Sequence, residues 1–597
     1  MVEAGQSSLR DRVAARVRSR AGLTYLPLLG YAVFTLLWIG RGVALHPTTR
    51  VLGNADRDKA LLMWSFSWWP HAIAHGLDPF VSKVVWAPHG VDLAWVTSSP
   101  TLSLLLTPFT ETLGPVFSYN LAALAAPPLA AWTTYLLARR ITRNVPGSLI
   151  AGFLFGFSPY VISQSITHLN LSFVCLVPLA GLLAVRFFDG DLGRWRYAAL
   201  LALVLTAQFG ISTEIFATFT VFAAICLALA VWLLDARPQL AALARYTALG
   251  YLATAVVVSP YLVHAFLRST AIVRRLSTIH SLDLANVFFP TETTWLRPPR
   301  DVSLVFVTSG LPELGGYIGI PLFLLVLYAV QIHATARVRR GIWLLAFAAL
   351  IAEAFALGTT VTLANHPGPP GVWAALRHLP ALGEAIPIRF VMYTALCLAL
   401  IAALWLAQPG PRLWRFVLAG AAVVSFLPTP SSAFWTANAH QPPFFATSIY
   451  RQYIHPGDRA LVFPYAWGQS WSMLWQAETG FRFSMIGGHV GQVIIPAECQ
   501  WAGAWGSLSG GLPRGGQAQF RRFILAHHVT VIIEAPHTES WSRRLIHASL
   551  PDVRAVHVAK VKIFRIPSDL PVALPPNSPY LPPHKPKLGI VRAICGK

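Results

Sequence analysis

The chain has 597 residues, of which 55% are hydrophobic and only 12% are charged. A soluble globular protein carries roughly 25% charged residues, so this composition excludes an ordinary soluble enzyme. The 21 Trp and 34 Phe agree with this exclusion, because aromatic residues gather at bilayer interfaces. We therefore predict an integral membrane protein.

The formal net charge is +22, from 46 Lys and Arg against 24 Asp and Glu. In a soluble chain this charge would suggest nucleic acid. Here most cations fall in short connections between apolar runs, where membrane topology and lipid headgroups explain them. We predict no nucleic-acid partner. The five cysteines show no CxxC or other metal-ligand spacing, so neither a disulfide framework nor a zinc site is expected.

Apolar windows of about 20 residues, the length that a helix needs to cross a bilayer, follow a basic N-terminal segment, 1–22. There are eleven, at 23–44, 116–138, 146–165, 168–187, 196–213, 214–234, 244–267, 314–331, 341–358, 389–408 and 412–429. The first is predicted to be an uncleaved anchor. Two further runs, 59–75 and 98–113, are ambiguous, and the Trp- and His-rich first run suits the interface plane. The predicted fold is an α-helical polytopic membrane protein with about eleven transmembrane and two interfacial helices.

The distribution of arginine predicts the orientation. With eleven spans and a cytoplasmic N-terminus, every inward connection is short and basic, as the positive-inside rule requires. If only one ambiguous run spanned, the basic clusters would face outward, whereas two would preserve the orientation. We expect a multi-pass protein of a bacterial cytoplasmic (inner) membrane. Its long outer segments are 45–115, 268–313, 359–388 and everything after about 430.

The last 165 residues alternate strand-like and helical runs, which is typical of an α/β domain. The strand-like runs are 459–464, 529–535, 553–559 and 562–566, and the helical runs are 470–479, 517–527 and 539–549. We therefore predict a transmembrane domain at 23–430 with the outer loop 45–115, an extracytoplasmic α/β domain at 431–566, and a Pro-rich tail at 567–597.

The first outer loop begins with a pair of carboxylates, Asp56 and Asp58. A carboxylate at the membrane surface can accept the proton of a hydroxyl that lies within hydrogen-bond reach. The structural alternative is that Asp58 caps a helix starting near Lys59 and that Asp56 pairs with Arg57. The sequence leaves both interpretations open.

Other polar residues lie at the predicted outer ends of spans. Glu214 lies where one span ends and the next begins, so it marks a substrate cavity or is simply solvated. His168 and Asn170 fall on an outer turn and are either functional or interfacial. Arg389 begins the tenth span, where its guanidinium can pair with a phosphate or extend to lipid headgroups.

Cations also persist in the outer segment 268–313, against the positive-inside bias. They are Arg268, Arg274, Arg275, Arg297 and Arg300. Long translocated loops are exempt from the rule. An anionic ligand at the outer face and contact with headgroups or acidic side chains are the two explanations.

Several enzyme classes lack their motifs. The sequence contains no GxxxxGK[ST], HExxH, GxSxG or Rossmann glycine fingerprint. Glu353 is the clearest charged residue within a span, so no series of intramembrane carboxylates for ion coupling is visible. The polar residues therefore concentrate at the outer interface.

This layout resembles the GT-C superfamily of multi-pass glycosyltransferases, which use polyprenyl-phosphate sugars. The resemblance covers roughly residues 20–430. Its motifs are the stretch Gly53 to Phe80 with its Trp-rich helix, Gly156-Phe-Ser-Pro-Tyr160, His168-Leu-Asn170 and Tyr317-Ile-Gly-Ile-Pro321. These motifs are moderately specific for the architecture and weak for any donor or acceptor.

The resemblance implies that a first-loop carboxylate is the catalytic base, here Asp58 in preference to Asp56. The chain departs from relatives that often have Gly-Asp-Pro at this point. A lipid-phosphate leaving group needs cationic stabilisation, for which Arg389 with Arg274 or Arg275 is the candidate. Glu214, His168 and Asn170 would complete the substrate-binding set.

The implied reaction inverts the anomeric carbon and requires neither a cofactor nor a metal, although it is compatible with a divalent cation. Its partners would be a polyprenyl-phosphate sugar donor, membrane lipid, and a glycan, lipid or protein acceptor. Two alternatives stay open: a non-enzymatic transporter or lipid flippase, and an inactive assembly partner in envelope biogenesis.

Overall fold

The structure is a computed structural model. It describes residues 20–269, 271–273, 280–297, 313–331, 334–378, 385–410, 412–465, 470–491, 493–508, 512, 515–576, 578–582 and 595. The chain divides into two compact units. The helical unit comprises Met1–Leu45, Leu121–Val257 and Leu276–Thr436. The mixed unit comprises His46–Asn120, Val258–Arg275 and Ala437–Lys597.

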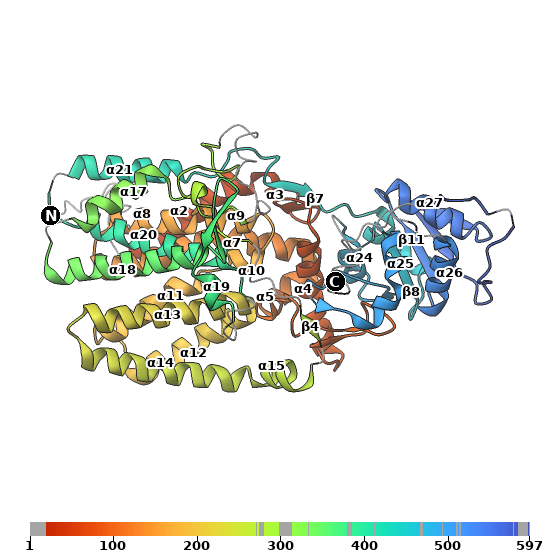
Figure 1. Cartoon of the computed structure of the whole chain (residues 1–597), viewed down its shortest axis with the longest axis horizontal. Coiled ribbons are helices and arrows are strands. Elements are labelled where there is room, and N and C mark those ends of the chain that lie inside the picture. The colour runs from red at the N-terminus through yellow and green to blue at the C-terminus, as the bar shows by residue number, and fades with distance from the viewer. Residues whose placement is uncertain are drawn as a thin grey trace, which may run out of the picture. The chain divides into compact units, whose positions relative to one another are not determined.

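Apolar helices build the helical unit, and the long ones run roughly parallel to one another (Figure 1). They are α2 (Arg20–Thr35) with its continuations η1 (Leu36–Gly40) and α3 (Arg41–Ala44), α7 (Pro115–Thr142), α8 (Val145–Gly156), α9 (Pro159–Ser165), α10 (Leu169–Ser172), α11 (Leu176–Phe188), α12 (Arg194–Ile211), α13 (Thr213–Leu233), α14 (Arg237–Val257), α17 (Gly319–Val330), α18 (Ala336–Ala356), α20 (Val391–Leu406) and α21 (Arg412–Ser425). The first residues of α7 belong to the mixed unit.

Six helices in the described chain are long and apolar enough to cross a membrane, or seven if one bent pair forms a single span. The six are Ala21–Ala44, Pro115–Thr142, Leu169–Phe188, Thr213–Leu233, Arg237–Val257 and Pro387–Leu406, and the bent pair is Val145–Gly156 with Pro159–Ser165. Each of the eleven predicted windows contains a helix, but α17 and α21 are shorter and α12 and α18 do not meet the same test. A multi-pass helical architecture is confirmed, and the number eleven stays a prediction.

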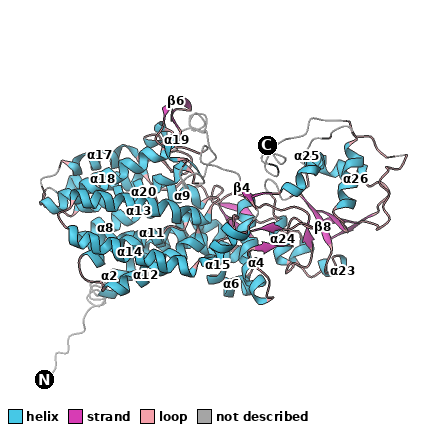
Figure 2. Ribbon diagram, turned by 60° about the horizontal axis from the view of Figure 1, so that its bottom comes forward, coloured by secondary structure: helices cyan, strands magenta, loops and turns pink. Residues whose placement is uncertain are grey.

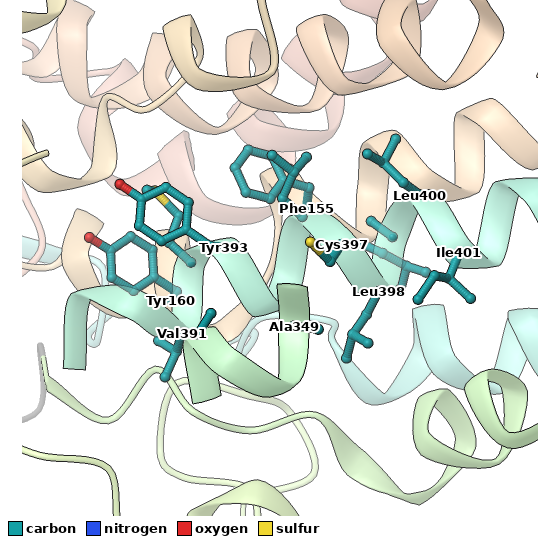
Figure 3. Close-up of a cluster of buried hydrophobic side chains, with 14 of the residues drawn as sticks. Phe155, Tyr160, Ala349, Val391, Tyr393, Cys397, Leu398, Leu400 and Ile401 are labelled. Atoms are coloured by element: carbon teal, nitrogen blue, oxygen red, sulfur yellow. The ribbon is translucent and has the colours of Figure 1, made fainter. Parts of the chain in front are cut away.

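Helix α20 forms the centre of the helical unit. It packs against α8, α17 and α18, and 94% of its apolar window is buried inside the protein. A helix that is apolar on all sides belongs in such a core. Figure 3 shows part of this core, with the hydroxyl groups of Tyr160 and Tyr393 pointing to the same side. Arg389, directly before α20, is therefore enclosed by protein and does not extend to headgroups.

Ion pairs connect the basic loops of the helical unit. Arg140 at the end of α7 contacts Asp189 at 2.9 Å, and Arg337 at the start of α18 contacts the same carboxylate at 3.1 Å. Arg340 pairs with Asp235, between α13 and α14. Four of the connections predicted to face inward, those that contain Arg140, Asp189, Asp235 and Arg337, therefore lie together at one end of the helices. The side of the membrane that they occupy stays a prediction.

The mixed unit contains a five-stranded sheet of order β12-β13-β11-β8-β9, and Figure 2 shows these strands in magenta. The strands are β8 (Arg459–Phe463), β9 (Ser484–Met485), β11 (Val531–Glu534), β12 (Ala555–Val558) and β13 (Val561–Arg565). Strand β8 is parallel to β9 and β11, whereas β13 is antiparallel to β11 and β12. Four of the strands overlap the predicted strand-like runs. The extracytoplasmic location of this region stays a prediction.

Helices flank the sheet or lie in the loops of the mixed unit. They are α4 (Arg57–Ala74), α5 (Pro100–Leu105), α6 (Thr107–Leu113), α15 (Ser259–Val263), η2 (His264–Arg268), α22 (Pro443–Ala446), α23 (Tyr450–Tyr453), α24 (Ser472–Glu478), η8 (Pro496–Trp501), α25 (Ala502–Leu508), α26 (Gly516–Ala526) and α27 (Ser540–Ser549). Small strand pairs are β2 (Val81–Ser82) with β3 (Val91–Asp92) and β4 (Ile272–Val273) with β10 (Val493–Ile494).

Smaller elements of the helical unit are η3 (Leu284–Val287), the hairpin of β5 (Thr360–Leu363) and β6 (His366–Pro370), α19 (Trp373–Leu376) and the 3₁₀ turn η7 (Pro387–Phe390). Strand β1 (Arg50–Leu52) pairs with β7 (Thr436–Asn438), whose last two residues belong to the mixed unit.

The ambiguous runs 59–75 and 98–113 form α4, α5 and α6, which are not among the candidate spans of the described chain. The Trp64 and Trp68 side chains of α4 are buried, and Trp64 Nε1 donates a hydrogen bond to Gln476 Oε1 at 2.8 Å. Protein therefore covers the tryptophans that suggested an interfacial helix. The relation of α4 to the bilayer surface stays a prediction.

The first outer loop and the C-terminal segment share one unit, although they are far apart in sequence. Trp86 N donates to Gly487 O at 3.1 Å, and Ala87 N donates to Met485 O at 3.2 Å. This joint core places the start of α4 beside the segment after β9. The predicted domain limits at 22, 430 and 566 stay predictions.

Candidate functional site

Asp56 and Asp58 have different structural roles at the start of α4. Asp56 is the N-cap of the helix, and its Oδ1 accepts a hydrogen bond from Asp58 N at 2.8 Å. The helix begins at Arg57, so the expectation that Asp58 caps a helix starting near Lys59 is wrong. The physical reason is the extended backbone of Asp56, which allows its carboxylate to satisfy an N–H of the first turn.

Asp58 pairs with a histidine that the sequence analysis did not identify. Its Oδ1 lies 2.5 Å from His489 Nε2. Because an ionised carboxylate only accepts hydrogen bonds, this geometry assigns the proton to Nε2. The Asp58 side chain is 37% exposed, whereas that of His489 is 5% exposed. The pair therefore holds a carboxylate in one orientation while a third of it stays accessible.

Lys59 anchors the loop before α4. Its side chain is buried, and Nζ donates to the carbonyl oxygens of Leu52 at 2.5 Å and Asn54 at 2.7 Å. Burial lowers the pKa of Lys59 to about 7, and the nearby charge of Asp56 offsets part of this effect. These contacts fix the chain between β1 and α4, so they determine where both aspartates lie.

A second polar cluster lies in the helical unit around Arg389. The Arg389 side chain is 3% exposed and its terminal nitrogens pair with both carboxylate oxygens of Glu313, with Nη2 at 3.1 Å from Oε1. Its Nε lies 3.3 Å from Glu214 Oε1, which also accepts a hydrogen bond from Ile386 N at 3.0 Å. Glu214 is in the first turn of α13, where a carboxylate is favoured by the helix dipole.

His168 belongs to the same cluster. Its Nδ1 lies 2.9 Å from Gln164 Oε1 and 3.8 Å from Glu313 Oε1, and Gln164 Nε2 donates to Glu313 Oε2 at 3.3 Å. Burial alone would raise the pKa of Glu313, but the charges of Arg389 and His168 hold it below its ordinary value. We name the set Arg389, Glu214, Glu313, His168 and Gln164 the Arg389 cluster.

The structure therefore brings together three predicted residues, Arg389, Glu214 and His168. Within the described residues, none of the hydrogen bonds of the Arg389 cluster reaches Asn170, which is buried on α10. Arg274 and Arg275 lie outside the described residues. No group of three or more His, Cys, Asp or Glu side chains in the described ranges could hold a metal ion.

Charge counting limits what the Arg389 cluster can bind. The guanidinium of Arg389 faces the two carboxylates of Glu214 and Glu313, so these three groups carry a net negative charge. Protonation of His168 would only neutralise the cluster, and a positive charge would need a further cation. A phosphate would compete with Glu313 for the same nitrogens. The phosphate-binding role of Arg389 stays a prediction.

Comparison with known proteins shows the family to which the chain belongs. Residues 27–429 match the family model described as "Domain of unknown function (DUF6311)". No curated protein sequence matches the chain. Among solved structures, the chain is similar to the arabinofuranosyltransferase AftD from Mycobacteria, with a TM-score of 0.59 at 15% identity over 92% of this chain and 40% of AftD.

The oligosaccharyltransferase of Archaeoglobus fulgidus is similar as well. Its apo form has a TM-score of 0.50 at 12% identity, covering 89% of this chain and 72% of the enzyme. The archaeal oligosaccharyltransferase AglB from Archaeoglobus fulgidus, in complex with an inhibitory peptide and a dolichol-phosphate, has a TM-score of 0.50 at 13% identity. The match covers 96% of this chain and 77% of AglB.

The chain spans about two-fifths of the length of AftD, and at these identities the similarity shows the fold alone. The chain therefore has a fold similar to those of two membrane-bound glycosyl-transferring enzymes, AftD and the archaeal oligosaccharyltransferase, and its membership of the GT-C superfamily stays a prediction. Because the matching residues 27–429 make up more than half of the chain, the protein belongs to the DUF6311 family.

Proposed function

We propose that the protein is a membrane glycosyltransferase that moves a sugar from a polyprenyl-phosphate donor to an envelope acceptor. The observation that carries this proposal is the Asp58 side chain, 37% exposed and paired with His489 at the start of α4, in a chain whose fold is similar to that of the arabinofuranosyltransferase AftD. The dolichol-phosphate in the complex of AglB supports a lipid-linked donor. The acceptor is a glycan, a lipid or a protein.

In this proposal Asp58 is the catalytic base. The acceptor hydroxyl transfers its proton to the carboxylate as its oxygen attacks the anomeric carbon, and the bond from that carbon to the lipid phosphate breaks with inversion. His489 is a positioning residue, because its Nε2–H holds one carboxylate oxygen. Asp56 is occupied as the helix cap, which favours Asp58 of the two predicted carboxylates.

The leaving lipid phosphate needs cationic stabilisation and no proton donor. The proposal that Arg274 and Arg275 stabilise this phosphate rests on the sequence alone. For the Arg389 cluster we propose a positioning role, since Arg389 is enclosed by two carboxylates and connects the turn η7 with the first turn of α13. Asn170 and His168 would contribute to the surroundings of the substrate.

The proposal includes the predicted setting of the reaction. The protein lies in the cytoplasmic membrane with its N-terminus inside and its C-terminal region outside, and the prenyl chain of the donor stays in lipid. Six or seven candidate spans in the part of the chain that the structure describes provide the necessary anchoring. The scheme needs no metal and is compatible with a divalent cation.

The experiment is incubation of the purified full-length chain in lipid nanodiscs with a panel of polyprenyl-phosphate sugars and candidate acceptors. Sugar transfer with an inverted anomeric centre, determined by NMR of the product, is the expected result. A parallel assay in vesicles measures movement of the same donor across the bilayer. Donor movement with no sugar release from any donor would contradict the proposal and support the flippase alternative.

A further inference from the structure

A histidine in the loop between β2 and β3 is held by a buried carboxylate that the proposed chemistry does not use. His89 Nδ1 lies 3.1 Å from Glu498 Oε1. The His89 side chain is 43% exposed, whereas that of Glu498 is 1% exposed. The Glu498 carboxylate also accepts a hydrogen bond from Trp505 Nε1 at 3.1 Å. An exposed imidazole is therefore attached to a carboxylate that water does not reach.

The neighbouring His527 determines the charge at this carboxylate. Its side chain is 1% exposed, and its Nδ1 lies 2.8 Å from the carbonyl oxygen of Phe523, which can only accept, so Nδ1 carries a proton. Its Nε2 lies 3.1 Å from Glu498 Oε1 and 3.0 Å from Oε2. Lone pairs facing each other at this separation would repel, so a second proton lies between Nε2 and the carboxylate. Glu498 and His527 together therefore carry no net charge.

These assignments fix the tautomer of His89. Because the shared proton lies toward His527, the Glu498 oxygen that faces His89 can only accept, and the proton of that contact belongs to His89 Nδ1. Since His527 already neutralises Glu498, the carboxylate does not require a second positive charge on His89. No hydrogen bond of the described residues involves His89 Nε2. The half-exposed ring therefore presents Nε2 as a hydrogen-bond acceptor in a fixed orientation.

The backbone of the same loop supplies an independent observation. Trp86 has a φ of 55°, in the left-handed region, and its buried Nε1 has no hydrogen-bond partner among the described residues. Non-glycine residues held in this region cluster at active sites and ligand sites. A buried ion pair such as Glu498–His527 is also weak evidence for stability, because desolvation can exceed the attraction. Orientation of the exposed His89 explains both features better than stability does.

The loop is attached to the segment that carries the partner of the proposed base. Trp86 N donates to Gly487 O at 3.1 Å, and His489, whose Nε2 holds Asp58, follows two residues later. With consecutive Cα atoms 3.8 Å apart, these connections limit the separation of His89 and His489 to about 25 Å. An acceptor of a few sugar units, bound at the base, is therefore long enough to reach His89.

We propose that His89 Nε2 binds a hydroxyl group of the acceptor and so favours a neutral sugar unit over an anionic one at this position. A sugar hydroxyl donates its proton to the lone pair of Nε2, whereas a carboxylate or phosphate oxygen that lacks a proton is repelled by it. The proposal rests on the proposed function, because it specifies the acceptor of that reaction. No bond breaks at His89, and Asp58 stays the base.

The first test needs no transfer activity. Diethyl pyrocarbonate acylates the unprotonated nitrogen of an imidazole, and peptide mass spectrometry follows each histidine of the full-length protein in nanodiscs. We expect His89 to react as fast as the exposed His537 and the buried His527 to stay unmodified. Neutral methyl glycosides of glucose, galactose, mannose and arabinose serve as probes. At least one should slow the modification of His89 and leave His537 unaffected, whereas glucuronate should protect neither.

Three results of this experiment would overturn the proposal: an unreactive His89, no protection by any neutral glycoside, or equal protection by glucuronate. The outcome does not depend on finding the donor. A protein that shows selective protection but transfers no sugar would therefore contradict only the proposed function. Sugar transfer without protection of His89 would contradict only this inference.

The second test separates the two nitrogens of His89 in the transfer assay. In His89→Gln the amide reaches the position of Nε2, whereas in His89→Asn it reaches only that of Nδ1, beside Glu498. We expect His89→Asn to raise KM for the acceptor about three- to tenfold at nearly constant kcat, the loss of one neutral hydrogen bond. His89→Gln should recover most of the affinity, and His537→Asn is the control at an exposed histidine. The reverse order of the two His89 variants would show that the contact with Glu498 matters instead, and would contradict the inference.

Discussion

The two polar clusters of the molecule differ in how closely protein surrounds their charges. In the helical unit, Arg389 and Glu313 have side-chain exposures of 3% and 6%, and each satisfies the other. In the mixed unit, Asp58 is held by a buried histidine but is itself 37% exposed. A closed ion pair keeps a structure together, because each charge is costly without its partner. A half-open pair can exchange a proton with a substrate.

Removing the cation of the closed cluster should have the largest effect on stability. Arg389→Met leaves the carboxylates of Glu313 and Glu214 facing each other without their partner. Breaking a buried pair in this way costs about 3–5 kcal/mol, which chemical unfolding of the purified protein would measure. Combining it with Glu313→Gln should recover part of the loss. Unchanged stability of the single variant would show that the cluster is not a structural ion pair.

Changing the partly exposed Asp58–His489 pair should lower the rate of sugar transfer more than it lowers the stability of the fold. His489→Gln removes the imidazole that orients the Asp58 carboxylate. We expect kcat for sugar transfer to fall by about ten- to a hundredfold, because misplaced catalytic groups lose activity on this scale, while KM for the acceptor stays nearly constant. A rise in KM alone would assign His489 to substrate binding instead of to positioning the base.

Lys59 should make stability depend on pH. Its folded-state pKa of about 7 is below the ordinary value of 10.5, so the unfolded state holds more protons between about pH 7 and 10. The free energy of unfolding should therefore rise with pH in that window, by at most about 1.4 kcal/mol per pH unit from this group. Lys59→Met should remove this part of the slope. Identical slopes in the two proteins would refute a buried, titrating Lys59.

Removing the N-cap of α4 should have the smallest effect of these changes, a small loss in the free energy of unfolding. Asp56→Ala removes the hydrogen bond to Asp58 N, and loss of an N-cap costs about 1 kcal/mol. Asp56→Asn keeps a capping oxygen and should cost less than Asp56→Ala in the same unfolding assay. Equal losses for both variants would mean that the negative charge of Asp56, and not its cap, stabilises α4.

The sequence predicted the helices and strands better than it predicted which side chains contact one another. Apolar windows located all the helices of the predicted spans, because hydrophobicity is a local property of about 20 residues. The helix starts at Arg57, two residues before the predicted start, so its cap is Asp56 and not Asp58. His489 was missed because its contact with Asp58 joins residues 431 positions apart, and no local pattern marks that histidine.

The Arg389 cluster also shows that the sequence identifies single polar residues but not the residues that they contact. Its Arg389, Glu214 and His168 were selected individually because each interrupts an apolar stretch near a span boundary. Glu313, which joins them, lies in a long loop where a carboxylate is unremarkable in sequence. Single polar residues at span ends can be recognised locally, but the partners that neutralise them depend on tertiary packing.

The central claim is that Asp58 is the base for sugar transfer. Its most direct test is the initial rate of transfer by Asp58→Asn compared with Asp56→Asn, the matched change two residues away, with both variants checked for unaltered melting temperatures. General-base catalysis contributes about 10²–10⁴-fold. We predict that Asp58→Asn lowers the rate at least a hundredfold and that Asp56→Asn keeps most of the activity. A rate within threefold of the unaltered protein for Asp58→Asn would contradict the account.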